Sequence, residues 1–437
     1  MREKAKRLIV VLVLLTVAGS LTACVRQKQY RYVNVTGRLP AIEDHQDKGY
    51  KVAFVEFKDN GDPHDSQQAS EAVKLINAER KITDTQYVAS SVVLIYVHGW
   101  KNNADRAALP KIKDVEKFEG TLEEIASLLP RLPDGRRTPL VGVYIGWHGK
   151  SLELPDTLNW VSFWPRGIAA GHVGGDSLTK TLNRLVEAGK AGASHAGVNP
   201  KVLIVGHSFG SRVLEQAEKR RSIQKGECNQ LHELGKPIKP PVDLILFVNA
   251  ATGSKVTREI IEECKPKDGS NPKHVFARHP DYSKERCEND EGPQATSPLC
   301  RPYPLFVSIS SRSDYATKIL LPVAALRLSA AHTNWLNTHR VIELKPEEEI
   351  PADHIFTFRS QFHNGDHRYV VLPKEKGQVD PFWIMTVDKN VISSHGDIWN
   401  QDFKNMLLNL MGQLQVVQMA APAYQRLPSG TKARAIQ

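Results

Sequence analysis

The chain has 437 residues, of which 41% are hydrophobic and 24% are charged, a balance typical of a soluble globular protein. This length is sufficient for one α/β domain with insertions, and the composition excludes a fibrous or mostly disordered chain. The formal net charge of +10 is spread along the sequence without a nucleic-acid-binding motif, so we expect no nucleic acid partner.

Residues 1–23 predict a secretory signal peptide, because a basic start (MREKAKR) precedes a short apolar run and the small residues before Cys24. The stretch Leu21-Thr22-Ala23-Cys24 resembles the lipobox of bacterial lipoproteins. The resemblance implies a diacylated Cys24 at the mature N-terminus and a lipid-anchored protein of the cell envelope. Val25, rather than Asp, follows the cysteine, which in a Gram-negative bacterium implies the periplasmic side of the outer membrane. The alternative is an uncleaved membrane anchor, but the apolar run is shorter than the ~20 residues that span a bilayer.

Residues 24–49 are expected to form a tether and an N-terminal extension. Three basic residues follow the cysteine, at Arg26, Lys28 and Arg31. They either rest on anionic lipid head groups or belong to a solvated linker, and the solvated linker is at least as good an interpretation.

Four further cysteines remain if Cys24 is lipidated, an even number in an oxidising compartment, which predicts disulfides. Three pairings are possible, and proximity along the chain favours Cys287–Cys300 with Cys228–Cys264. Neither a C-x-x-C pair nor a nearby histidine at ligand spacing indicates zinc, so we expect no metal.

Short apolar runs separated by helix-like segments indicate an α/β domain over residues 50–417, built on a mostly parallel, doubly wound sheet with helices on both faces. The strand candidates are Lys51–Phe57, Val92–Val97, Leu140–Ile145, Val202–Val205, Val242–Val248, Leu305–Ser310 and Phe382–Val387. The clearest helix candidates are Ser66–Lys81, Ser211–Arg221 and Asn400–Leu414.

Two polar segments interrupt this alternation. Residues 253–303, which contain three of the cysteines, predict a cap-like insertion that covers a site or is mobile. Residues 343–380 form a second polar insertion, and residues 418–437 are expected to be a frayed C-terminal tail.

Ser208 is the candidate nucleophile, because Gly206-His207-Ser208-Phe209-Gly210 lies between a predicted strand and a predicted helix. A Gly-x-Ser-x-Gly sequence in that context exposes the serine hydroxyl on a sharp turn, where a side chain at either glycine would clash. The alternative is an ordinary glycine-rich turn.

Asp314 is the candidate acid, since it follows the strand that ends near Ser310, and sites of parallel sheets gather at the carboxyl ends of strands. Its rivals are weaker: Asp243 begins its strand, Asp366 lies in the second insertion, and Asp388 ends the last strand.

His395 is the candidate base, because it follows the last predicted strand and so completes the chain order serine, acid, histidine. His363 and His367 precede that strand.

The backbone N–H groups of Trp100 and Phe209 are the candidate oxyanion-hole donors, one after the strand that ends in His98-Gly99 and the other after Ser208. We expect His98 to shape its loop. Trp100, Trp147 and His148 either line an apolar acyl pocket or simply pack.

The chain resembles α/β-hydrolases, and more closely a largely uncharacterised bacterial group of them. The matching stretches, spanning about residues 50–410 in the same order, are "VAFVEFKDNGDPHDSQQ", "VVLIYVHGWKNNAD", "VGVYIGWHGKSLELP", "FWPRGIAAGHVGGDSL", "VLIVGHSFGSRVLEQA", "SDYATKILLP" and "HGDIWN". The resemblance implies a serine hydrolase with Ser208, Asp314 and His395 as its triad, and it implies no substrate.

The sequence thus predicts a membrane-tethered serine hydrolase, a carboxylesterase or lipase-like enzyme that needs no cofactor. Because the 253–303 segment is too polar for a lid that opens on lipid, we expect a small ester substrate. A thioesterase or peptidase would use the same triad, and a non-catalytic envelope protein with a hydrolase fold is the alternative from another class.

Overall fold

The structure is a computed structural model that describes residues 28–83, 86–87, 91–105, 113–132, 135–149, 163–191, 200–225, 242–252, 306–311, 313–314, 355–359, 366–371, 382–387 and 391–413, with positions 256, 259, 260 and 389. The predicted signal peptide, Cys24, the 418–437 tail and nearly all of the 253–303 insertion lie outside the described residues. So do the four cysteines of the predicted disulfides, Cys228, Cys264, Cys287 and Cys300.

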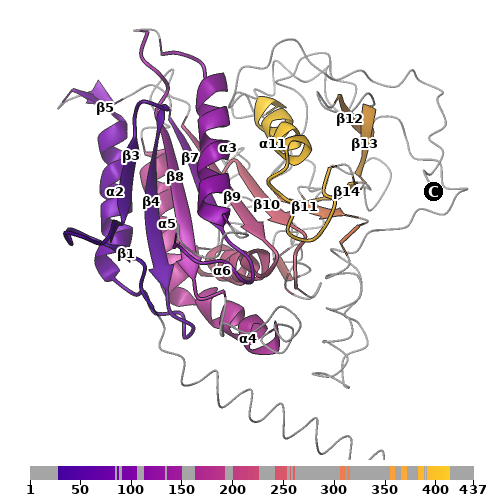
Figure 1. Ribbon diagram of the computed structural model, residues 1–437, viewed down its shortest axis with the longest axis horizontal. Coiled ribbons are helices and arrows are strands. Elements are labelled where there is room, and N and C mark those ends of the chain that lie inside the picture. Colours follow the sequence, from indigo (N-terminus) through magenta and orange to yellow (C-terminus); the bar gives the residue numbers. More distant parts are fainter. Residues whose placement is uncertain are drawn as a thin grey trace, which may run out of the picture.

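A ten-stranded, mostly parallel sheet forms the centre of the molecule, in the order β12-β13-β14-β11-β10-β9-β7-β8-β4-β3 (Figure 1). The seven strands from β14 to β4 in that order run parallel, whereas β3, β12 and β13 pair antiparallel. The strands are β3 (Ile42–His45), β4 (Tyr50–Phe57), β7 (Val92–Val97), β8 (Leu140–Trp147), β9 (Lys201–His207), β10 (Leu244–Val248), β11 (Phe306–Ser311), β12 (Ile355–Arg359), β13 (Asp366–Val371) and β14 (Phe382–Val387). Two short ladders, β1 (Arg31–Tyr32) with β2 (Leu39–Pro40) and β5 (Lys81–Thr83) with β6 (Gln86–Tyr87), lie apart from this sheet.

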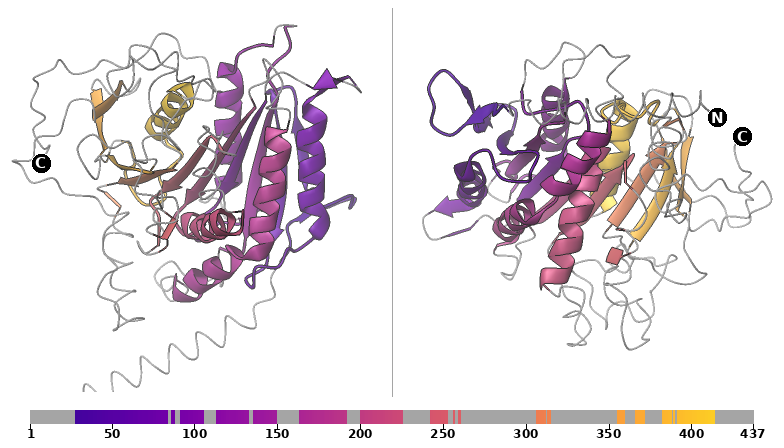
Figure 2. Two further views of the ribbon diagram at one scale, coloured as in Figure 1. Left: turned by 180° about the vertical axis from the view of Figure 1, so that it is seen from behind. Right: turned by 90° about the horizontal axis from the view of Figure 1, so that it is seen from below.

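Helices cover both faces of the sheet, as the apolar strands predict (Figure 2). One face packs against α2 (Ser66–Glu79), α4 (Phe163–Val173), α5 (Asp176–Lys190) and α6 (Phe209–Lys225), and the other against α3 (Asp114–Leu128) and α11 (Gln401–Gln413). In β7, Val93, Ile95 and Val97 enter the first core, whereas alternate residues enter the second. Because both faces are buried, a central strand has no polar side, which explains its continuous apolar sequence. The predicted α/β class with a mostly parallel sheet is confirmed.

The strand order changes direction at β7, and this change positions the candidate site. After β7 the chain continues to β8 on one side, whereas after β9 it continues to β10 on the other side. The next helices also diverge, since α3 lies on one face of the sheet and α6 on the opposite face. Such a reversal opens a crevice at the carboxyl ends of the two strands. Ser208 follows β9, and the Gly99–Trp100 peptide follows β7.

The segment expected as a tether contributes to the folded domain from residue 28 onward. Its β3 pairs with β4, and Arg31 is fully buried. The Arg31 guanidinium lies 3.6 Å from the centroid of the Phe54 ring, forms an ion pair with Glu43, and donates through Nε to the Ala104 carbonyl at 2.7 Å. Both interpretations of Arg31 from the sequence, contact with lipid head groups and a solvated linker, are therefore wrong, because buried partners compensate its charge.

The second predicted insertion, residues 343–380, contains β12 and β13, which extend the edge of the sheet. Neither strand was expected from the sequence. None of the helices in the described ranges combines the length and the apolar character that crossing a bilayer would require.

Candidate active site

Ser208 occupies the sharp turn between the end of β9 at His207 and the start of α6 at Phe209. The residue is only 3% exposed, so the solvent-exposed serine expected from the motif is not observed. Its φ of 56° lies in the left-handed region, which non-glycine residues rarely adopt and which is concentrated at functional sites. The flanking glycines allow the turn to form. A Cβ at Gly210 would lie 2.1 Å from the Val97 carbonyl oxygen, and one at Gly206 would lie 2.8 Å from the Ser211 Cα.

Three side chains from three separate segments form one hydrogen-bonded chain. His395 Nε2 lies 2.6 Å from Ser208 Oγ, and His395 Nδ1 lies 2.9 Å and 3.0 Å from the two carboxylate oxygens of Asp314. Because the carboxylate only accepts, Nδ1 carries the proton, and the Nε2 lone pair faces the serine hydroxyl. This is the tautomer that a general base requires. The structure therefore brings the three predicted side chains together.

The rival residues lie elsewhere or outside the described positions. Asp243 is at the opposite end of the sheet, where it accepts from the Val202 N–H at 2.7 Å and pairs with Lys190 at 2.6 Å. Asp366 and His367 belong to the antiparallel strand β13, and His363 and Asp388 are outside the described residues.

The loop after β7 packs directly against the candidate nucleophile. A Cβ at Gly99 would lie 2.8 Å from Ser208 Cβ, so only glycine allows this approach. His98 Nε2 accepts from the Trp147 N–H at 3.0 Å, which leaves Nδ1 as the donor to the Gly99 carbonyl at 2.8 Å. The C=O and N–H of a trans peptide point in opposite directions. His98 thus fixes the direction of the Trp100 N–H, in agreement with the expected loop-shaping role.

Trp147 was expected either to line an acyl pocket or to pack, and the structure shows that it packs. Its ring is buried, stacks on His98 at a centroid distance of 5.7 Å, and donates from Nε1 to the His98 carbonyl at 2.8 Å. The adjoining His148 carbonyl accepts from Arg166 at 2.6 Å, and Arg166 is bidentate on Asp59. These contacts fix the loop that follows β8. This loop in turn contacts the loop that follows β7, because the Lys101 N–H donates to the Gly149 carbonyl at 2.9 Å.

Two buried histidines beside Ser208 remain uncharged. Burial lowers the pKa of His98 to about 4 and that of His207 to about 3. His207 and Asn249 both contact the His395 carbonyl, and neither was expected as a site residue from the sequence. His207 lies inside the serine motif and could have been singled out by that position, whereas Asn249 carries no sequence signal beyond its place after a strand.

The His98 pKa predicts a loss of stability in acid. The unfolded imidazole takes up a proton as pH falls below about 6.5, whereas the folded one stays neutral until about pH 4, so the lost stability is about 2 kcal/mol between pH 7 and pH 5. We expect His98→Asn to show a correspondingly smaller fall in the free energy of unfolding across that range, measured with urea. Glu56, whose pKa burial raises to about 7, acts in the opposite sense but is common to both proteins. Equal pH dependence in the two proteins would contradict this prediction.

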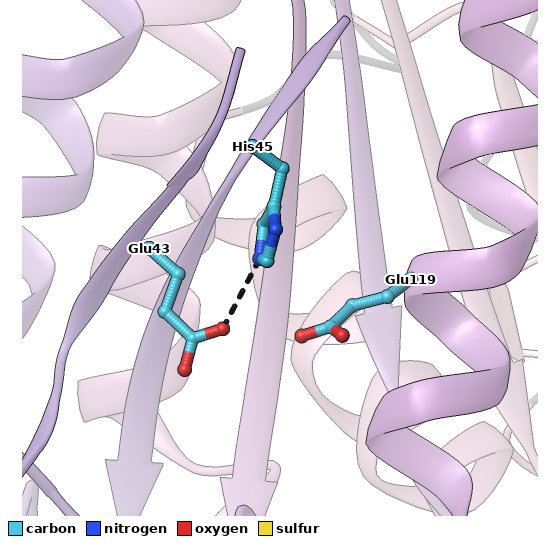
Figure 3. Close-up of side chains that lie close together, drawn as sticks. All are labelled: Glu43, His45 and Glu119. Carbon is cyan, nitrogen blue, oxygen red and sulfur yellow. Dashed lines mark hydrogen bonds and ion pairs between the residues drawn. The ribbon is translucent and has the colours of Figure 1, made fainter. Parts of the chain in front are cut away.

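In the described part of the chain, one group of side chains has the donor types and proximity of a metal site: Glu43, His45 and Glu119, whose ligand atoms lie within 4.8 Å of one another (Figure 3). His45 Nε2 lies 3.3 Å from Glu43 Oε2, and the other Glu43 oxygen pairs with Arg31. The group lies on β3 and α3, and β3 is the fourth strand from β9 in the sheet, or about 19 Å at the usual strand spacing. The group is thus remote from Ser208, and its Glu43 carboxylate already pairs with Arg31.

Comparison with known proteins gives no assignment. No protein-family model matches the chain, and no curated protein matches it. Among solved structures, the chain is similar to an uncharacterized protein from Pseudomonas aeruginosa, with 10% identity and a TM-score of 0.22 over 60% of this chain and 42% of that chain. The chain thus spans less than half the length of that protein. Since this likeness is too low to carry an argument, the interpretation of the site depends on its geometry.

Proposed function

We propose that this protein is a serine hydrolase with an α/β-hydrolase fold and that it cleaves carboxylic esters. The observation that carries the proposal is the hydrogen-bonded chain from Asp314 through His395 to Ser208. Three further observations support the proposal. They are the strand–turn–helix position of the serine, the left-handed Ser208 backbone, and the order serine, acid, histidine along the sequence.

In the proposed reaction, the Ser208 oxygen attacks the ester carbonyl carbon while His395 Nε2 accepts the hydroxyl proton. Asp314 stabilises the imidazolium that forms, and the backbone N–H groups of Trp100 and Phe209 stabilise the oxyanion. The imidazolium then protonates the leaving alkoxide, which departs as the alcohol. Water, deprotonated by His395, then attacks the acyl carbon of the acyl-enzyme. The bond from this carbon to the Ser208 oxygen breaks, His395 returns the proton to that oxygen, and the acid is released. The reaction requires no metal or organic cofactor.

The expected substrate is a small ester, because the 253–303 segment is too polar for a lid that opens on a lipid surface. A long-chain, lipid-like ester is the alternative within the same chemistry. We also propose that the protein is anchored through Cys24 to the bacterial envelope, which is supported by the lipobox-like stretch before that residue.

Two measurements on protein lacking residues 1–24 test the function. A fluorophosphonate probe should label Ser208 covalently, and hydrolysis rates should be highest for short acyl chains in a series of p-nitrophenyl esters. Lack of labelling under conditions that label a reference serine hydrolase would favour the non-catalytic envelope protein. A preference for long chains would move the assignment to a lipase.

A further inference from the structure

The candidate base lies between β14 and α11, among residues 391–400, none of which belongs to a helix or a strand. Its position therefore depends on side chains that hold its backbone. Ser311 Oγ donates to the Ile392 carbonyl at 2.6 Å, and Asn400 Nδ2 donates to the Val391 carbonyl at 2.7 Å. The carbonyl of His395 itself accepts two further hydrogen bonds, which use both of its lone pairs.

The first of these bonds comes from His207, the last residue of β9. His207 Nε2 lies 2.8 Å from the His395 carbonyl oxygen, and because that oxygen only accepts, Nε2 carries the proton. His207 is 5% exposed and directly precedes Ser208. The bond therefore closes a ring, in which Ser208 and His395 are joined both by their side chains and through His207.

The second bond comes from Asn249, the residue after β10. Its Nδ2 donates to the His395 carbonyl at 3.2 Å, and its Oδ1 accepts from the Ser311 N–H at 3.0 Å. These partners assign the amide orientation, since an N–H only donates and a carbonyl only accepts. The Asp314 N–H in turn donates to the Ser311 carbonyl at 3.2 Å. Asn249 thus joins the segment of the acid to the segment of the base.

The backbone of Asn249 is constrained for this contact. Its φ is 45°, a left-handed conformation that asparagine tolerates better than most residues. Its own N–H donates to the Ile309 carbonyl at 2.8 Å. Both the backbone and the side chain of Asn249 are therefore held by β11, through Ile309 and Ser311.

We propose that the side chains of His207 and Asn249, which we call the His395 clamp, are positioning residues that hold the base within reach of both Ser208 and Asp314. Neither residue contacts the reacting atoms in the proposed reaction. The clamp holds the His395 backbone. Because the imidazole is joined to that backbone through Cβ alone, a displaced backbone would displace the ring as well. This inference rests on the proposed hydrolase function.

The first test compares two substitutions of His207. His207→Phe keeps the ring but removes the donor, whereas His207→Gln keeps a donor near the position of Nε2. We expect His207→Phe to lower kcat for p-nitrophenyl acetate by about 10-fold to 100-fold, the range that small misplacements cause, with KM changed by less than about 2-fold. His207→Gln should restore most of kcat. Thr138→Val removes a hydroxyl donor to the Pro130 carbonyl at the opposite end of the sheet. It is the control for loss of a partly buried hydrogen bond and should keep the wild-type kcat.

The second test uses Asn249→Asp, which keeps the size and the backbone tolerance but replaces the donor with an acceptor. We expect kcat to fall again at nearly constant KM. The double variant His207→Phe/Asn249→Asp should lose less than the product of the single losses, because both side chains bind one oxygen. Far-UV circular dichroism and thermal unfolding show whether each variant is folded. If His207→Phe does not fold, the kcat values of Asn249→Asp and His207→Gln test the proposal instead.

The possible failures are distinguishable. A folded wild-type protein that neither hydrolyses esters nor reacts with a fluorophosphonate overturns the proposed function and the inference with it. An active wild type in which Asn249→Asp and His207→Phe keep the wild-type kcat overturns the inference alone. So does a His207→Gln variant that is as impaired as His207→Phe, since the ring's packing rather than its donor would then matter.

Discussion

Replacement of Ser208 by alanine is expected to lower kcat for ester hydrolysis by about 10⁴-fold to 10⁶-fold, as loss of a serine nucleophile does in other enzymes. The attacking oxygen is removed, whereas the backbone hydrogen bonds of the turn remain: the residue 208 N–H donates to the Val248 carbonyl at 3.0 Å, and its carbonyl accepts from the Ala251 N–H at 3.1 Å. The variant should therefore fold and still bind substrate. Steady-state kinetics with p-nitrophenyl esters, together with fluorophosphonate labelling, measure the effect.

Ser127→Ala provides the matched control for this variant, because Ser127 is an exposed serine of α3 whose hydroxyl donates only to the Glu124 carbonyl within the helix. It should keep the wild-type kcat and be labelled normally. Retained ester hydrolysis in folded Ser208→Ala would refute the assignment of the nucleophile. Labelling at another residue would place the reactive group elsewhere.

Features that depend on local sequence were predictable. Fully apolar runs such as Val92–Val97 predicted central strands, because a strand buried on both faces has no polar side. The serine motif predicted the turn after β9. Since the carboxyl ends of parallel strands meet at one edge of a sheet, positions just after β11 and β14 were sufficient to select Asp314 and His395, which lie in hydrogen-bonding contact with one another.

Features that depend on distant partners were not predictable. From its neighbours in the sequence, Arg31 is a basic residue of a linker. Its burial is explained by distant partners: its guanidinium pairs with Glu43, and its backbone N–H donates to Glu56. The same limit applies to the His395 clamp, since nothing in the sequence near Asn249 specifies a contact with a carbonyl 146 positions away. Strands β12 and β13, of which β12 forms the edge of the sheet, lie in a polar segment. Their pairing is set by the sheet that they join rather than by their own hydrophobic periodicity.

Replacement of Asp314 by asparagine is expected to lower kcat by about 10⁴-fold, the effect of the equivalent change in a well-studied serine protease. Both Asp314 oxygens lie within 3.0 Å of His395 Nδ1, so the carboxylate selects the tautomer with the proton on Nδ1. An amide in the same place offers an N–H to Nδ1 and favours the proton on Nε2. The base would then have no lone pair directed at Ser208, although the shape of the site would be nearly unchanged.

Asp243→Asn is the matched control for Asp314→Asn, because the Asp243 side chain is 8% exposed and that of Asp314 is 1% exposed. The partners of Asp243, which include Lys190 and the Val202 N–H, lie at the opposite end of the sheet. Asp243→Asn is expected to reduce thermal stability without changing kcat, whereas Asp314→Asn should change kcat with little effect on stability. This opposite pattern distinguishes a catalytic acid from a structural one, since general loss of packing would lower both quantities in both variants. If Asp314→Asn kept the wild-type kcat, the acid of the triad would have to be sought among the rivals, and the hydrogen bond to His395 would serve structure alone.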